Sequence, residues 1–197
     1  MSSLITDFKT EDGFWVKTRT VDSIKLETKS YRLWKSMKAR CSIAVHLSRP
    51  TYLDCTMSSE FEHYQVFAEW CQSQIGFNME HTTLDKDLLI RGNKMYGPEV
   101  CVFVPTELNV LLNKHKATRG KFPIGVHKNT QGYGFTAQCN VDGERVYLGV
   151  YKTPLEAFEV YKQFKQNLIK TKAKVFKERI DVRVFESLMN YEVKIDD

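Results

Sequence analysis

Long apolar runs are absent from this chain of 197 residues. A membrane-spanning helix needs about 20 consecutive apolar residues, and no stretch approaches that length, so the sequence predicts no membrane segment. The amino terminus lacks the basic-then-apolar pattern of a secretory signal. The five cysteines are odd in number and form no close Cys-x-x-Cys pair. We therefore expect an intracellular protein with reduced thiols.

Several catalytic signatures are also missing. The sequence shows no Ser/His/Asp arrangement, no phosphate-binding glycine loop and no dinucleotide fingerprint. What is present is an ordinary globular composition, with 42% hydrophobic and 27% charged residues, which argues against wholesale disorder. The length suits one large domain or two to three small ones.

Charge is unevenly spread along the chain. Residues 1–109 carry 13 basic and 14 acidic side chains (net −1), residues 110–179 carry 14 and 5 (net +9), and residues 180–197 carry 2 and 5 (net −3). The total of +5 only permits a nucleic-acid partner. A net +9 over seventy residues favours one, because phosphate neutralisation needs a local basic surface.

The first part of the chain predicts helices. Residues 1–29 show no clear period and are interpreted as an arm or short strands. Apolar residues at spacings of three and four predict a helix from Ser30 and a second helix over 61–75. Between them, residues 46–59 contain proline, serine and threonine and predict a loop.

A compact ββα unit is expected next. Strands are predicted at 84–90 and at 101–104, separated by glycine-containing turns. A helix follows, with Thr106 or Pro105 as its start signal.

The second part of the chain predicts a small sheet and a helix. Residues 114–122 are basic, short of apolar side chains and interpreted as a linker. Strands are expected at 124–127, 133–139 and 145–150, the last two joined by a tight Val141-Asp142-Gly143 turn. Thr153 is the expected cap of a helix with Pro154 at its first position. The tail from Thr171 predicts one more helix.

The ββα region carries a set of motifs that resembles a nuclease family. The set comprises Leu84-Asp85-Lys86-Asp87, Gly92-Asn93-Lys94, Glu99-Val100-Cys101-Val102-Phe103-Val104 and Leu108-Asn109. Upstream lie Tyr31-x-x-Trp34-x-x-Met37-x-x-Arg40-Cys41, Pro50-Thr51-Tyr52 and Phe67-x-x-Trp70. Together, over about residues 30–113, these motifs resemble the HNH homing endonucleases of bacteriophages.

The resemblance implies a metal-dependent site. In that family a strand Asp and a helix Asn or His hold one divalent ion against the scissile phosphate, which assigns these roles to Asp85 and Asn109, with Mg²⁺ or a similar cation. Lys86 stands where the family has its general-base His, and a lysine needs strong burial or a cationic neighbour to act as a base. Asp87 is the nearest alternative base. The competing interpretation is a solvated, self-paired charge cluster.

A structural zinc site is a weaker candidate. Its ligands would come from Cys41, Cys55 and Cys101 with His46, His63 or His81. The irregular spacings favour buried free thiols instead.

The basic segment resembles a second family. The matching residues are Gly125-Val126, Phe135-Thr136-Ala137-Gln138-Cys139, Arg145-Val146-Tyr147-Leu148-Gly149-Val150-Tyr151 and Thr153-Pro154-Leu155-Glu156-Ala157-Phe158. Over residues 123–168 they resemble an APETALA-type DNA-binding domain, which implies three strands, a packing helix and double-stranded DNA as partner. The family's usual Trp residues are replaced by Phe135 and Tyr147, and its strand-end Arg by Asn140.

Strand periodicity predicts which side chains face outward from this sheet. Ala137, Cys139 and Leu148 should face the helix. The side chains then aimed at base edges are Thr136, Gln138, Asn140, Arg145 and Tyr147. Phosphate contacts are expected from His127, Lys128, Lys152 and the lysine-rich linker. The competing interpretation is a small module with an ordinary charged face.

Taken together, the sequence predicts an α+β protein in which a ββα-metal nuclease-like module is joined to a three-stranded antiparallel sheet with a packing helix. The expected segments are an arm (1–29), the nuclease-like domain (30–113), a basic linker (114–122), the APETALA-type domain (123–170) and a helical extension (171–197). The expected function is metal-dependent hydrolysis of duplex DNA in the cytoplasm of a bacterial host. One alternative is a catalytically degenerate regulator that binds DNA or a host protein. Another is a module that turns its basic face to an acidic protein.

Overall fold

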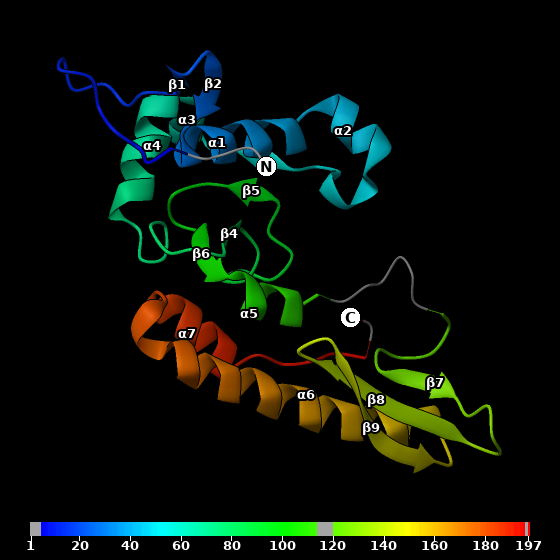
Figure 1. Ribbon diagram of the computed structural model, residues 1–197. Coiled ribbons are helices and arrows are strands. Elements are labelled where there is room, and N and C mark those ends of the chain that lie inside the picture. Colours follow the sequence, from blue (N-terminus) through cyan, green and yellow to red (C-terminus); the bar gives the residue numbers. More distant parts are fainter. Residues whose placement is uncertain (1–4, 114–119, 196) are drawn as a thin grey trace. The chain divides into compact units, whose positions relative to one another are not determined.

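Two compact units make up the chain, Met1–Val104 and Pro105–Asp197. The computed structural model (Figure 1) describes residues 5–113, 120–195 and 197. Most of the predicted linker, residues 114–119, lies outside this described part. Helices and small sheets occur in both units, so the predicted α+β class is confirmed.

The first unit contains short strands and helices in alternation. Its elements are β1 (Thr18–Val21), β2 (Ile24–Glu27), α1 (Lys29–Arg40), α2 (Ile43–Ser48), a 3₁₀ turn (Pro50–Tyr52), β3 (Thr56–Met57), α3 (Ser59–Glu62), α4 (Tyr64–Ser73), β4 (Thr82–Asp85), β5 (Met95–Tyr96) and β6 (Val102–Pro105). β1 pairs with β2, β3 with β5, and β4 with β6.

The predicted amino-terminal arm includes a hairpin. β1 and β2 run antiparallel around Asp22 and Ser23, whose φ angles are 49° and 62°. A two-residue turn with both central residues at positive φ matches the twist of the strands that it joins. Upstream, Asp7 Oδ1 accepts the backbone N–H of Ser30 at 3.1 Å, which ties the arm to the start of α1.

Aromatic rings form the core of the first unit. Its buried members are Met37, Cys55, Phe61, Phe67, Cys71, Phe77, Leu84, Tyr96, Cys101 and Phe103. The ring of Trp70 lies 4.9 Å from that of Phe61 and 5.8 Å from that of Phe103. This packing places β6 against α4 and holds the end of β4 in position.

The predicted helix over 61–75 is wrong as one element, because α3 and α4 are separated at His63. The backbone of His63 is extended, with φ −96° and ψ 114°. In an unbroken helix Phe61 and Phe67 would lie about 120° apart around the axis. The break lets both rings enter one core, edge to face at 5.0 Å. Ile75 lies beyond the end of α4 and is exposed.

The second unit contains one sheet and one long helix. Its elements are α5 (Thr106–Leu111), β7 (Val126–Lys128), β8 (Phe135–Val141), β9 (Glu144–Tyr151), α6 (Pro154–Phe176), a 3₁₀ turn (Lys177–Arg179) and α7 (Val182–Met189). The strands form an antiparallel sheet in the order β7-β8-β9. α6 lies along one face of this sheet (Figure 1), as the sequence predicts.

The start of α6 matches its sequence signal. Thr153 Oγ1 accepts the N–H of Glu156 at 3.2 Å, and Glu156 Oε2 accepts the N–H of Thr153 at 3.2 Å. This reciprocal capping box, with Pro154 at the first position, fixes the direction in which the helix leaves β9. Leu155 is 56% exposed and lies about 120° around the helix from the buried Tyr161.

The core of the second unit reaches beyond the sheet and the first turns of α6. Val126, Ala137, Cys139, Ala157, Phe158 and Tyr161 pack together with Val193 from the carboxyl-terminal segment. The N–H of Val193 donates to Gln166 Oε1 at 3.2 Å, which fastens that segment to α6. α7 packs against the distal part of α6, where Ile169, Ala173 and Phe176 are buried. Among the described residues, no helix is long and apolar enough to cross a membrane.

Candidate functional site

The sheet of the second unit has one packed face and one polar face. Ala137 and Cys139 are buried on the side of α6, and Leu148 packs against the same core, which confirms the predicted inner face. Across the register, His127 pairs with Thr136 and Arg145 pairs with Asn140. Tyr147 pairs with Gln138. The predicted outward residues therefore share one face, called here the outer face.

A β-bulge interrupts the alternation along β9 and keeps the faces of β8 and β9 matched on both sides of it. Tyr147 faces Gln138, whereas Gly149, two residues later, faces Ala137. Leu148 is the extra residue, and its side chain stays with the core. The insertion shifts the pattern by one position, so that Val150, opposite Thr136, returns to the outer face.

The outer face is hollowed into a polar cleft of about 680 Å³. Six of the eight predicted DNA-binding residues line it: His127, Lys128, Thr136, Gln138, Arg145 and Tyr147. Asn140 stands directly beside Arg145 at the end of the hairpin. Lys152 lies just past β9, where its N–H donates to Glu156 Oε2 at 3.0 Å.

Sequence reasoning missed part of the cleft wall. Asn129, Thr130 and Gln131, in the loop between β7 and β8, line the cleft as well. Asn129 Oδ1 accepts the N–H of Gln131 at 3.2 Å, a local contact that shapes the loop. Turn residues follow no period, which is why the period-two alternation of the strands did not find them.

Positive charge gathers on this face. Partial burial and the guanidinium of Arg145 both lower the pKa of His127. Lys128 adds an exposed ammonium next to His127. Lys128 and Arg145 make this face basic, and a basic surface favours a bound anion.

The other predicted site lies at the end of β4. Asp85 Oδ1 accepts the backbone N–H groups of Asp87 and Leu88 at 2.9 Å and 2.8 Å. These bonds turn the chain, so the predicted strand over 84–90 is wrong and β4 ends at Asp85.

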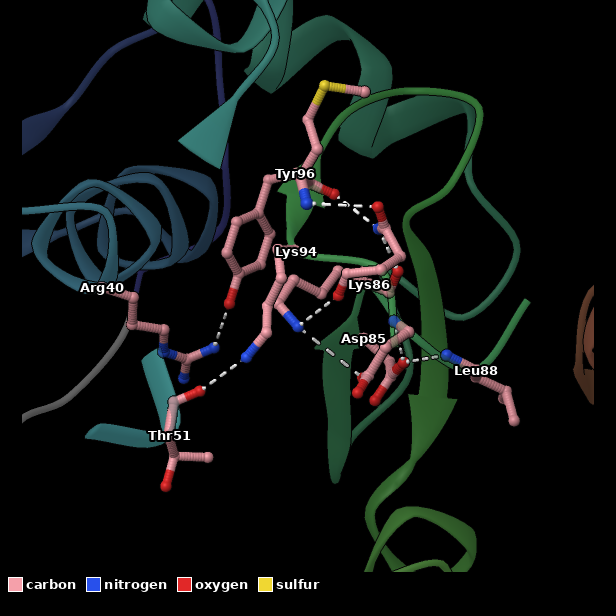
Figure 2. A network of polar contacts seen from close by, with 10 residues as sticks. Arg40, Thr51, Asp85, Lys86, Leu88, Lys94 and Tyr96 are labelled. Carbon is pink, nitrogen blue, oxygen red and sulfur yellow. Dashed lines mark hydrogen bonds and ion pairs between the residues drawn. The ribbon is translucent and has the colours of Figure 1, made fainter. Parts of the chain in front are cut away.

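Lys86 and Asn93 close the loop that follows (Figure 2). Lys86 Nζ donates to the carbonyl of Asn93 at 3.0 Å, and the Asn93 amide donates to the carbonyl oxygens of Lys86 and Met95 at 2.6 Å and 2.7 Å. The side chain of Lys86 is 11% exposed, and its ammonium lies 3.9 Å from Asp87 Oδ1. Both the Asp-Lys-Asp and the Gly-Asn-Lys motifs thus take part in folding one loop.

Asp85 is a partly buried carboxyl group with a second acid, Asp87, beside it. Burial and the neighbouring charge of Asp87 raise the pKa of Asp85. Two carboxylates that repel each other are oxygen ligands of the kind that Mg²⁺ takes, usually one or two at a time with several waters. The donor chemistry of Asp85 and Asp87 therefore fits a divalent ion.

The full predicted ligand pair is not assembled within one unit. Asp85 belongs to the first unit, and Asn109 lies on α5 of the second unit. The sharing of a metal between them stays a prediction. Across the described part of the chain, no three His, Cys, Asp or Glu side chains form a group that could hold a metal ion.

The cysteines are free thiols. Cys55, Cys71, Cys101 and Cys139 are buried and Cys41 is partly buried, as predicted. Burial raises the pKa of Cys41 to about 11 and that of Cys101 to about 12. Both groups therefore keep their protons at neutral pH.

Comparisons with known proteins found no relative. No family model, no curated protein and no solved structure matches this chain. The function is therefore inferred from the geometry of the outer face of the sheet and of the loop after β4.

Proposed function

We propose that this protein binds double-stranded DNA through the outer face of its three-stranded sheet. The observation that carries the proposal is the polar cleft in which His127, Lys128 and Arg145 converge on the side of the sheet opposite α6. When a small sheet packs against one helix, only the face toward the helix contributes to the hydrophobic core. The other face, when it is polar and basic, is free to meet a phosphate backbone.

The dimensions of the sheet suit the major groove. β7 covers only residues 126–128, so beyond Ala137 the hairpin continues as a two-stranded ribbon. Neighbouring strands lie about 4.8 Å apart, and the major groove, about 12 Å wide, admits a ribbon of this kind. His127 and Lys128 of β7 then lie at the base of the ribbon, where phosphates line the groove.

Titration of a labelled duplex in a series of salt concentrations tests the proposal. We expect salt-dependent binding, because each phosphate contact releases counterions. Lys128→Ala should weaken binding and reduce the salt slope by about 1, and Arg145→Ala should weaken binding. The matched control is Lys174→Ala, which removes an exposed cation from α6. Affinity that is absent, or independent of salt and of Arg145, would rule the proposal out.

A second candidate function is metal-dependent cleavage of the bound DNA, as the resemblance to HNH endonucleases implies. It is favoured by the raised pKa of Asp85 beside Asp87, since a divalent cation would relieve this repulsion. Asp85 would hold the ion, with Asn109 as the second ligand that the resemblance assigns. When bound, the ion would neutralise charge on the scissile phosphate. Lys86, whose ammonium donates to the carbonyl of Asn93, would position the loop.

Incubation with supercoiled plasmid in Mg²⁺, in Mn²⁺ and in chelator tests cleavage. Asp85→Asn keeps an oxygen for the two backbone N–H groups but removes the carboxylate, so it should abolish nicking while the loop stays folded. Asn109→Ala should also abolish nicking, and Glu62→Gln, an exposed acid of α3, should not. DNA binding without cleavage in any metal would instead favour the catalytically degenerate regulator of DNA or of a host protein.

A further inference from the structure

The two ends of the outer face have different chemistry. At the end that β7 covers, the cleft is lined by the imidazole of His127 and by the ammonium-bearing side chain of Lys128. At the ribbon end, the outward pairs are Gln138 with Tyr147 and Asn140 with Arg145. Amides and a guanidinium offer directional hydrogen bonds in fixed patterns, whereas an isolated ammonium offers a point charge. The ribbon is therefore the end equipped to distinguish bases.

Acidic groups near the ribbon tip are drawn away from its outer face. Asp142 is in the turn, and its carboxylate contacts Lys172 of α6 at 3.0 Å, on the helix side of the sheet. Glu144 pairs with Val141, and this pair comes directly after the outward pair of Asn140 and Arg145. Because side chains alternate along a strand, Glu144 is on the opposite side from the outer face. A phosphate or base edge approaching the outer face thus meets amides and a cation.

We propose that the ribbon prefers adenine opposite Gln138 and opposite Asn140, with guanine next to the second adenine, opposite Arg145. This inference rests on the proposed binding of duplex DNA and adds its sequence preference. An amide side chain matches the donor and acceptor that adenine presents in the major groove, and a guanidinium matches the two acceptors of guanine.

Geometry sets the spacing of the preferred bases. Gln138 and Asn140 are two residues apart on β8, so their side chains emerge about 6.8 Å apart. Base pairs follow at about 3.4 Å along the duplex axis, and the two adenines are therefore about two steps apart. Arg145 stands directly across from Asn140, which places the guanine beside the second adenine. Tyr147, 65% exposed, offers its ring to a neighbouring thymine methyl group.

Selection from a pool of random duplexes, with the full chain as the binder, tests the preference. We expect an enriched motif with two adenines about two steps apart and an adjacent guanine. On that selected duplex, Gln138→Ala and Asn140→Ala should each lose roughly 5- to 150-fold in affinity and should each relax one position of the motif. Binding to a scrambled duplex should change little. Asn140→Arg should convert its adenine to guanine, and Lys174→Ala should leave the motif intact.

The outcomes separate this inference from the proposed function. Salt-dependent binding without any enriched motif would overturn the preference and leave DNA binding in place. A motif that survives both amide substitutions would also overturn it, because other residues would then read the bases. Absence of DNA binding would remove the proposed function and this inference together. Circular dichroism of each variant verifies the fold, since Asn140 is exposed and its removal leaves the core unchanged.

Discussion

Polar side chains serve opposite purposes in the two units. In the loop after β4, Asp85, Lys86 and Asn93 direct their hydrogen bonds to the chain's own backbone. On the outer face of the sheet, Asn140 and Arg145 point away from the packed side and are exposed. The first set stabilises the loop after β4, whereas the second set is exposed on a surface that a ligand can contact.

The difference shows how a sequence motif can be over-interpreted. Folding of the loop already accounts for Asp85 Oδ1, for Lys86 Nζ and for the amide of Asn93. A metal at Asp85 would have to coexist with these bonds. The outer face is not explained by folding, because the core of the second unit lies on the other side of the sheet. DNA binding is accordingly the stronger of the two proposals.

The largest expected effect concerns the packed side of the sheet. Gly125 has φ +78°, and a Cβ there would lie 2.1 Å from the ring of the buried Tyr161. Gly125→Ala should therefore lower the free energy of unfolding of the second unit by about 3–5 kcal/mol. All three tryptophans lie in the first unit. In a denaturant titration, the midpoint measured by tryptophan fluorescence should not change. Part of the transition measured by far-UV circular dichroism should shift to lower denaturant concentration.

Gly143→Ala is the matched control. Gly143 also has positive φ, at +89°, but nothing lies within 4 Å of a Cβ built there. Its substitution should cost only the backbone strain, about 1–2 kcal/mol. Equal losses for the two glycines would contradict the close packing of Tyr161 against β7.

The next effect concerns the loop after β4. Asp85→Ala leaves two backbone N–H groups without their acceptor and should destabilise the first unit by about 1–3 kcal/mol. Asp85→Asn retains an oxygen and should be close to neutral. Folding raises the pKa of Asp85. In the pH range between the unfolded and the native pKa, the native state therefore binds more protons than the unfolded state. The contribution of Asp85 to stability should thus fall as pH rises through the raised pKa.

Denaturant midpoints measured by tryptophan fluorescence over a range of pH report the contribution of Asp85 to stability. The decrease with rising pH should disappear in Asp85→Asn. A large loss of stability in Asp85→Asn at neutral pH would show that the charge itself is needed, which would strengthen the case for a bound cation.

A smaller effect is expected from His127. The lowered pKa keeps this side chain neutral at pH 7 in the free protein. A nearby phosphate favours the charged form and raises the pKa in the complex, so affinity for DNA should increase as pH falls. We expect an increase of about two- to fivefold between pH 8 and pH 5.5. His127→Gln should bind with no such pH dependence, and an unchanged profile in that variant would place the phosphate elsewhere.

The smallest effect concerns stability at the outer face. Asn140→Ala and Tyr147→Ala should each change the free energy of unfolding by no more than about 0.5 kcal/mol, because both side chains are exposed. Thermal unfolding measures this, and affinity for DNA measured on the same samples completes the comparison. A loss of stability as large as that of Asp85→Ala would show that the outer face also has a folding role.

Much of the fold of the second unit could be predicted from local signals. Thr153, Pro154 and Glu156 specify the start of α6 at the positions where the structure has it. Asp142 and Gly143, at φ 51° and 89°, form the predicted tight turn. These features depend on residues close together in sequence, which is why the sequence predicts them.

Features that the hydrophobic period does not record were missed. A continuous helical period runs through His63, and the break there follows from the shared core of Phe61 and Phe67. The apolar run after Asp87 suggests a strand, but the carboxylate of Asp85 turns the chain first. In the candidate site, period-two alternation predicts the outer face, whereas the loop at Asn129 that walls the cleft has no periodic signal.

The insertion of Val193 into the core beneath the sheet has a practical consequence for dissecting the molecule. The stretch that resembles a DNA-binding domain stops near residue 168, some 25 positions before a side chain that its core contains. A fragment cut at the limit of the resemblance would leave a hole beside Tyr161 and would lose the helix that covers the end of α6. A fragment that keeps the core beneath the sheet must therefore run past Val193.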